Sequence, residues 1–139
     1  MQSYRTEKAI AASPEKVWAC LTDPSAYGEW APSIECFEGE MAQDEQLTMH
    51  HTSGNKTRVK ITQMESPRQY ILSGGLPLNM VTGTRSFQLT PQVDGTTLFV
   101  MEEVFSGWLM PIFGRVIPDL SQSFEDFALA LQKRVEATT

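Results

Sequence analysis

Arg85 and Glu103 are the two residues whose charges the sequence places together most directly. They lie in neighbouring segments of alternating polar and apolar residues, separated by the turn signal Asp94-Gly95. If this hairpin pairs Phe87 with Met101 or with Glu103, the same register puts Arg85 beside Glu103 on the apolar face. Buried charges are costly unless they are paired. The pair is therefore a structural clamp, the polar anchor of a ligand or an acid–base pair.

The histidines and cysteines offer weaker chemistry. His50 and His51 are adjacent, and alternation along a strand sends their rings to opposite faces, so they cannot chelate one metal ion. His51 shares a face with Met49, and we expect it in the wall of a cavity, since no carboxylate beside it at strand spacing supports a general base. Cys20 and Cys36 lack a catalytic His-Asn or His-Asp context, so we expect reduced, non-nucleophilic thiols.

Several function classes lack a signal altogether. The sequence contains no glycine-rich phosphate loop, no HExxH and no CxxC, so we expect no metal and no cofactor. A net charge of −6 without a basic cluster makes nucleic acid an unexpected partner. The first eight residues contain no apolar signal-peptide core, and the weakly charged stretch 105–118 is interrupted by Gly, Pro and Arg. We therefore expect no membrane span and a cytoplasmic location.

Hydrophobic periodicity predicts the elements that position these residues. An alternating segment predicts a strand over 4–11, and Ser13-Pro14 begins a short helix. Asp23-Pro24 ends that helix and begins a second short one. Between residues 33 and 105 the period is two, with turn signals every 8 to 14 positions, which predicts six antiparallel strands. Helical spacing returns over 118–136.

Together these elements predict an α+β fold in one domain, residues 1–139. A curved seven-stranded antiparallel sheet grips the long C-terminal helix, with two short helices between the first two strands. Such a sheet leaves a cavity under the helix. Alternate turns of a meander share one end of the sheet, so Ser53-Gly54-Asn55, the loop 74–80 and the junction 106–111 should surround its opening.

The predicted cavity is lined by inward-facing side chains that are mostly aliphatic, aromatic or thioether, with a few polar ones. We expect this set to be Trp30, Met49, His51, Ile61, Gln63, Tyr70, Leu72, Arg85, Phe87, Met101, Glu103, Phe105, Ile117, Leu120 and Phe124. The apolar stretch Trp108–Phe113 lies at the opening. It is a mobile gate, a self-association surface that forms a homodimer, or a packed first turn.

Two segments carry a family resemblance. Ile10-Ala11-Ala12-Ser13-Pro14-Glu15-Lys16-Val17-Trp18, with Tyr27-Gly28-Glu29-Trp30-Ala31-Pro32 after it, resembles the opening of the START-like helix-grip superfamily, also called SRPBCC or polyketide cyclase/dehydrase-like. Glu103-Val104-Phe105-Ser106-Gly107 resembles its final strand and junction. Related sequences more often have histidine at the positions of Arg85 and Met101, and its absence here argues against a histidine-based mechanism.

The resemblance implies the helix-grip fold but several functions, since the superfamily includes lipid carriers, cyclases, hormone receptors, oxygenase subunits and activators of a heat-shock ATPase. The first hypothesis is binding of a small hydrophobic or amphipathic molecule under the C-terminal helix. The second is a cyclase- or dehydrase-like enzyme, in which Arg85 polarises a carbonyl and Glu103 moves a proton. The third is a protein-partner module that resembles the ATPase activators and contacts its partner through Trp108.

Overall fold

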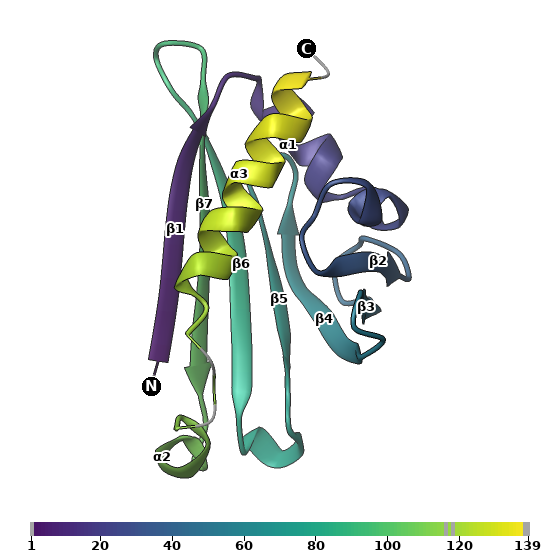
Figure 1. Cartoon of the computed structure of the whole chain (residues 1–139), viewed down its shortest axis with the longest axis vertical. Helices are drawn as coiled ribbons and strands as arrows, with labels where there is room; N and C mark the ends of the chain where they lie inside the picture. The colour runs from purple at the N-terminus through teal and green to yellow at the C-terminus, as the bar shows by residue number, and fades with distance from the viewer. Residues whose placement is uncertain (1, 116, 118, 138–139) are drawn as a thin grey trace.

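The computed structural model describes residues 2–115, 117 and 119–137. One antiparallel sheet curves around a long helix (Figure 1). The elements are β1 (Gln2–Ile10), α1 (Pro14–Leu21), η1 (Pro24–Glu29), β2 (Ile34–Glu38), β3 (Gln46–His51), β4 (Lys56–Glu65), β5 (Gln69–Gly75), η2 (Pro77–Asn79), β6 (Thr82–Pro91), β7 (Thr97–Ser106), α2 (Met110–Phe113) and α3 (Ser121–Ala137). The predicted fold class is confirmed.

The two short helices begin at the predicted signals. Ser13 is the N-cap of α1, and its side-chain oxygen accepts a hydrogen bond from the backbone N–H of Lys16 at 3.3 Å. Pro14 occupies the first turn of α1, and Pro24 does so in η1, which is a 3-10 helix. The second short helix is therefore confirmed, in a tighter form than an α-helix.

The C-terminal helix begins later than the periodicity predicts. Pro118, its predicted first residue, lies outside the described residues, and α3 begins at Ser121. The backbone N–H of Ser121 donates to the Asp119 side chain at 2.9 Å. The apolar stretch before it forms α2, a separate helix of 4 residues. α3 then packs against β1 and β7 across one face of the sheet (Figure 1).

The sheet has the order β1-β7-β6-β5-β4-β3-β2, and every neighbouring pair is antiparallel. The β6–β7 hairpin pairs Phe87 with Met101 and Arg85 with Glu103, which confirms the predicted register. This ladder has no irregularity between Thr82 and Pro91. Residue parity, the alternation of side chains between the two faces of a strand, therefore assigns the faces of these two strands correctly.

Parity fails in β4 because the strand contains a bulge. Ile61 pairs with Leu72, but the next partners are Gln63 with Ile71 and Met64 with Tyr70. Thr62 is thus an extra residue, and it reverses the facing of everything after it. Met64 packs against the core, while Gln63 points to the opposite face of the sheet.

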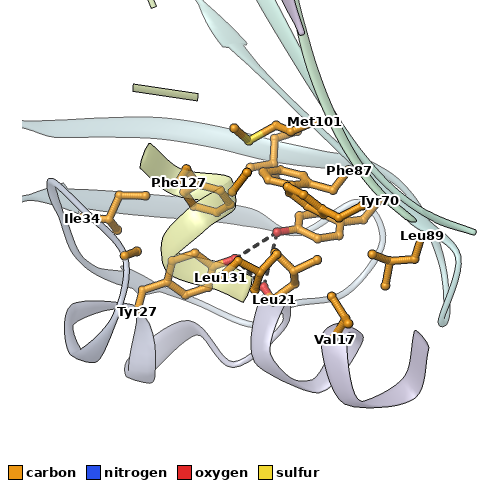
Figure 2. Packing of buried hydrophobic residues seen from close by; sticks show 14 of the residues in the cluster. Val17, Leu21, Tyr27, Ile34, Tyr70, Phe87, Leu89, Met101, Phe127 and Leu131 are labelled. Atoms are coloured by element: carbon orange, nitrogen blue, oxygen red, sulfur yellow. Dashed lines mark hydrogen bonds between the residues drawn. The ribbon is translucent and has the colours of Figure 1, made fainter. Parts of the chain in front are cut away.

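The interior is divided along the length of the strands. In the half covered by α1 and η1, aromatic and aliphatic side chains pack into a buried core (Figure 2). Tyr70 and Phe87 stack with ring centroids 4.5 Å apart, and Phe127 of α3 lies 6.0 Å from Phe87. The other half lies away from α1 and η1, and there the interior is hollow.

Candidate functional site

The hollow half of the interior is a cavity of about 460 Å³ between the sheet and the start of α3. Its walls come from β2 to β7, from the segments that precede β2, β6 and α3, and from α3 itself. The lining residues are Pro32, Ser33, Ile34, Met49, His51, Thr57, Val59, Leu72, Gly74, Gly75, Val81, Gly83, Arg85, Met101, Glu103, Phe105, Leu120, Ser123, Phe124, Asp126 and Phe127. The volume lies within the range of small-molecule sites.

The structure brings together most of the residues that the sequence placed in this cavity. Seven of them occupy inward positions in the half of the sheet away from α1 and η1, and the other two lie just before α3 and in its first turn. They are Met49, His51, Leu72, Arg85, Met101, Glu103, Phe105, Leu120 and Phe124.

Four other predicted lining residues belong to the packed core. Ile61, Tyr70 and Phe87 face inward as expected, but they are buried at the filled end of the strands and do not line the cavity. Trp30 contacts the ring of Phe127 at 5.2 Å and lines a separate hollow of about 280 Å³ beside α1. The three strand positions were wrong because alternation along a strand gives a face of the sheet and not a place along it. Trp30 follows η1 and packs beside Tyr27 at the filled end.

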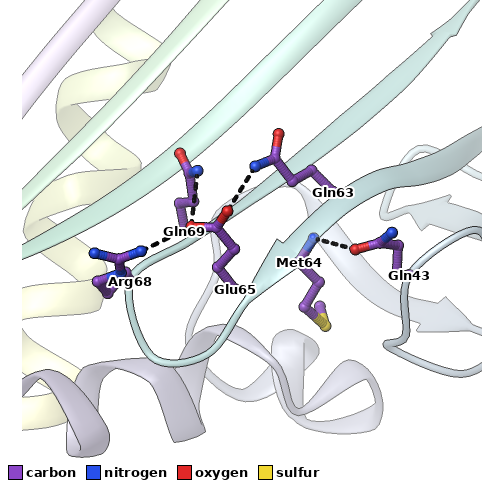
Figure 3. Close-up of polar contacts among 6 residues, drawn as sticks. All are labelled: Gln43, Gln63, Met64, Glu65, Arg68 and Gln69. Atoms are coloured by element: carbon purple, nitrogen blue, oxygen red, sulfur yellow. Dashed lines mark hydrogen bonds and ion pairs between the residues drawn. The ribbon is translucent and has the colours of Figure 1, made fainter.

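Gln63 was also placed wrongly, for a different reason. The bulge at Thr62 turns it away from the cavity, and its side-chain amide donates to Glu65 at 2.9 Å on the outer face (Figure 3). Gln69 and Arg68 donate to the same carboxylate. These hydrogen bonds lower the pKa of Glu65, and the hydrogen bond from Gln63 has the largest effect. Ile117 is half-buried but is absent from the cavity lining.

Glycines form part of the wall that the sequence reading missed. A Cβ on Gly83 would lie 3.1 Å from the Phe105 ring, and one on Gly74 would lie 2.8 Å from the Arg58 carbonyl oxygen. Glycine therefore leaves space in the cavity beside Phe105 at position 83, whereas at position 74 it allows the close approach of the β4 backbone. Gly83 and Val81 alternate with Arg85, so the parity of β6 was a sufficient signal to find them.

Arg85 and Glu103 are the charged pair inside the cavity. Nη2 of Arg85 donates to Oε2 of Glu103 at 3.1 Å, and only 22% and 12% of the two side chains are exposed. The guanidinium carbon lies 5.1 Å from the centre of the Phe124 ring, a cation–π contact that fixes its plane. Nε of Arg85 is buried and has no hydrogen-bond partner among the described residues. A part of the donor capacity of the guanidinium is thus unused.

The two histidine rings diverge, as predicted. Nε2 of His51 hydrogen-bonds to the Thr57 hydroxyl at 2.9 Å, and both residues line the cavity. Nε2 of His50 hydrogen-bonds to Glu38 at 2.8 Å, and neither residue lines the cavity. The rings therefore act separately, and His51 offers one further polar group to a cavity occupant.

The packed half contains titratable groups that stay neutral. Burial raises the pKa of the Tyr27 and Tyr70 hydroxyls, and the positive charge of Arg85 opposes the rise in both. Burial likewise raises the pKa of the Cys20 thiol to about 11. Cys20 is consequently a thiol at neutral pH, which agrees with the expectation that it is no nucleophile.

At the end of the sheet where β5, β6 and β7 meet α2, two of the segments predicted to surround the opening are joined. The backbone N–H of Leu109 donates to the Met80 carbonyl at 2.9 Å, and Nε1 of Trp108 donates to the Leu78 carbonyl at 3.1 Å. Leu78, Trp108 and Ile112 are exposed by 83%, 64% and 66%. For the third segment, the turn at 53–55, the flanking residues His51 and Thr57 reach the cavity wall.

No helix within 2–115, 117 and 119–137 has both the length and the apolar character to cross a membrane.

Known structures share this architecture. A protein from Mesorhizobium loti superposes with a TM-score of 0.77 at 20% identity, covering 99% of both chains. A START superfamily protein from Mycobacterium smegmatis has a TM-score of 0.73 at 19% identity, also covering 99% of both chains. Norcoclaurine synthase from Thalictrum flavum, solved with dopamine and hydroxybenzaldehyde, has a TM-score of 0.72 at 15% identity, covering 99% of this chain and 88% of the synthase. At these identities the similarity establishes the fold alone.

Sequence comparison agrees with the structural one. No curated protein gives a significant match. The family model described as polyketide cyclase / dehydrase and lipid transport matches residues 1–136. The polyketide cyclase/dehydrase-like resemblance in the sequence is thereby confirmed, and the chain belongs to the polyketide cyclase / dehydrase and lipid transport family.

Proposed function

We propose that this chain, as one helix-grip domain, binds a small hydrophobic or amphipathic molecule in the cavity between the sheet and α3. The observation that carries the proposal is the cavity itself. It has a volume of about 460 Å³, and Arg85 and Glu103 lie on a wall that is otherwise largely apolar. A domain that needed no ligand would gain stability by filling this space with side chains, as it does at its other end.

The lining residues suit a ligand with an apolar body and one polar end. Met49, Leu72, Met101 and Phe105 offer adaptable apolar contacts. The family description includes lipid transport, and the structurally similar norcoclaurine synthase was solved with two small aromatic molecules. Both support a small, largely apolar occupant without identifying it.

Binding is tested by native mass spectrometry of the gently purified protein and by thermal-shift screening of fatty acids and aromatic polyketides. Leu72→Trp fills the cavity, and it should weaken any hit at least about tenfold. Ile71→Trp is the matched control, because Ile71 is the neighbouring residue on β5 and is absent from the cavity lining. Ligand-free protein together with a screen without stabilisation would refute the proposal.

A cyclase- or dehydrase-like enzyme is the second candidate, and the specific observation in its favour is the placement of Arg85 beside Glu103 in the cavity. Arg85 would polarise a substrate carbonyl, and Glu103 would transfer a proton. Glu103→Gln should then abolish turnover while an uncharged substrate still binds. Unchanged turnover in this variant would exclude Glu103 from the chemistry.

The exposed apolar surface of Trp108 and Ile112 favours a third candidate, association with a protein partner or a second copy of the chain. Under this candidate Trp108→Ser would abolish capture of a partner or shift a homodimer to monomer in sedimentation. A concentration-independent monomer that captures nothing in the wild type would contradict it.

A further inference from the structure

We propose that the ligand of this cavity is uncharged and that its polar end both accepts and donates a hydrogen bond, as a primary amide or a hydroxy ketone does. The inference rests on the ligand-binding function proposed above, and it names the chemical class that the cavity selects. Carboxylates such as fatty acids fall outside this class.

The first argument is the balance of charge on the cavity wall. Arg85 is the cation among the lining residues, and Glu103 already pairs with it at 3.1 Å. Asp126 of α3 adds a second carboxylate, which accepts a hydrogen bond from Gln122 at 2.9 Å. An anionic ligand would have to compete with Glu103 for the guanidinium in a partly desolvated site, and it would also approach the exposed carboxylate of Asp126. The wall therefore disfavours a negative charge on the ligand.

The second argument is the unused hydrogen-bonding capacity of the same pair. A guanidinium has five N–H donors, and Arg85 engages one of them, on Nη2, in a hydrogen bond to a described residue. Nε also has no such partner, but it is fully buried, so the donors left for a ligand are those on Nη1 and Nη2. Glu103 accepts that bond with Oε2, while its Oε1 accepts none from the described residues. Free donors and a free acceptor thus lie side by side at one place on the wall.

The space around Glu103 Oε1 is open because the facing strand carries a glycine there. A Cβ at Gly83 would lie 3.7 Å from Oε1. A larger side chain in β6 would therefore cover the oxygen. The ring of Phe124 holds the guanidinium from the α3 side, 5.1 Å from its carbon. The pair is consequently fixed in position, and a ligand head that matches it needs little rearrangement to bind.

A group that complements this arrangement accepts from Arg85 and donates to Glu103. A primary amide does both without a charge, and a hydroxy ketone does so with two neighbouring groups. An ester or an isolated ketone accepts but leaves Glu103 Oε1 unpaired, and a carboxylate meets it with repulsion. Sites built to hydrogen-bond a specific polar group discriminate strongly against analogues that lack it.

The test uses probes that share one apolar body and differ only at the polar end. Decanamide, decanoate and methyl decanoate form one series, and naphthamide, naphthoate and methyl naphthoate form an aromatic one. Binding is measured by calorimetry at about pH 7.5, where the acids are ionised. In the series whose body fits, we expect the amide to bind at least about tenfold more tightly than the carboxylate, with the ester between them.

The Glu103→Gln variant should reduce or reverse the preference for the amide over the carboxylate. It removes the charge that neutralises Arg85, so the affinity for the carboxylate should rise at least about tenfold while the amide loses little. Glu102→Gln is the matched control, because Glu102 is the preceding residue of β7 and pairs with Ser86 rather than lining the cavity. Asp126→Asn, at an exposed position, should raise carboxylate affinity without endangering the fold.

The outcomes separate this inference from the proposed function. If no probe binds and the wider screen is also negative, ligand binding itself is refuted. If probes bind but the wild type prefers the carboxylate, or if Glu103→Gln does not raise carboxylate affinity, the proposed ligand class is wrong and ligand binding stands.

Discussion

The hydroxyl groups of Tyr27 and Tyr70 meet at 3.0 Å in the centre of the packed half, although the two residues lie on a short helix and on a strand of the sheet. The Tyr27 hydroxyl donates to the carbonyl oxygen of Leu21 at the end of α1, and the Tyr70 hydroxyl shares its one proton between Tyr27 and the same carbonyl, which lies 3.3 Å away (Figure 2). Three elements are thereby joined by one buried polar cluster. The cluster satisfies a helix-end carbonyl that would otherwise be buried without a partner.

This cluster predicts a stability change without a change in ligand binding. Tyr70→Phe removes one hydroxyl, while Tyr27 still bonds to Leu21, so the free energy of unfolding should fall by about 1 kcal/mol. Urea denaturation measures this loss. Affinity for any cavity ligand should change less than about twofold, since neither tyrosine lines the cavity. A stability equal to that of the wild type would show that the cluster contributes nothing.

Alkaline pH should destabilise the fold through the same residues. Burial raises the pKa of Tyr27 and Tyr70 above the ordinary value of 10.0. Above that pH the unfolded chain releases protons that the folded chain keeps, so stability is complete below pH 10 and falls as the pH rises. Cys20, with its pKa raised to about 11, adds a loss that begins near its ordinary value of 9.0.

The measurement is the free energy of unfolding from pH 8 to 11 for the wild type and for Tyr27→Phe/Tyr70→Phe. Each tyrosine contributes a slope of up to about 1.4 kcal/mol per pH unit once the unfolded form is ionised. The free energy of unfolding of the double variant should therefore fall less steeply as the pH rises. If the free energy of unfolding falls equally steeply with pH in the two proteins, the tyrosine hydroxyls do not cause the loss.

Sequence parity predicted the polar centre of the site but not its extent. Arg85 and Glu103 were found because the β6–β7 ladder is regular, so a count from the turn gives both partner and face. Gln63 was misplaced because the bulge at Thr62 has no glycine or proline to mark it. The local sequence of β4 therefore contains no sign of the reversal.

The boundary between core and cavity depends on tertiary packing. Phe87 and Arg85 have the same parity on β6, yet one is packed in the core and the other lines the cavity. The difference arises because α1 and η1 cover only one end of the sheet. Tyr70 and Leu72 on β5 are divided in the same way. Periodicity reports the face of a strand, whereas the filling of each end depends on helices that are distant in sequence.

A structural clamp and a ligand anchor are separable by substitution of the ion pair. Arg85→Met leaves the nearly buried Glu103 without its partner, so the free energy of unfolding should fall by about 3 kcal/mol. Arg85→Met/Glu103→Leu removes both charges and should recover most of that loss. If the pair anchors the ligand, the double variant is stable but loses the preference for a polar head, as calorimetry with the amide and ester probes would show.

The control for this pair is the exposed ion pair between Arg68 and Glu65, in which the Arg68 side chain is 72% exposed. Arg68→Met should leave stability unchanged within error, because solvent screens exposed pairs. If the Arg85 and Arg68 variants lose the same stability, burial is not what makes the inner pair matter. If the stable double variant binds the amide as the wild type does, the pair is only a clamp.

Gln63 and Leu72 give the final prediction, because parity placed both in the cavity and the structure places only Leu72 there. Gln63→Ala should change the affinity for a cavity ligand less than about twofold, whereas Leu72→Ala removes apolar wall and should weaken it by at least about fivefold. Titration of both variants with the same ligand measures the contrast. Equal losses would contradict the placement of Gln63 on the outer face of the sheet. An effect of Leu72 alone would show that a single extra residue in one strand decides which side chains meet the ligand.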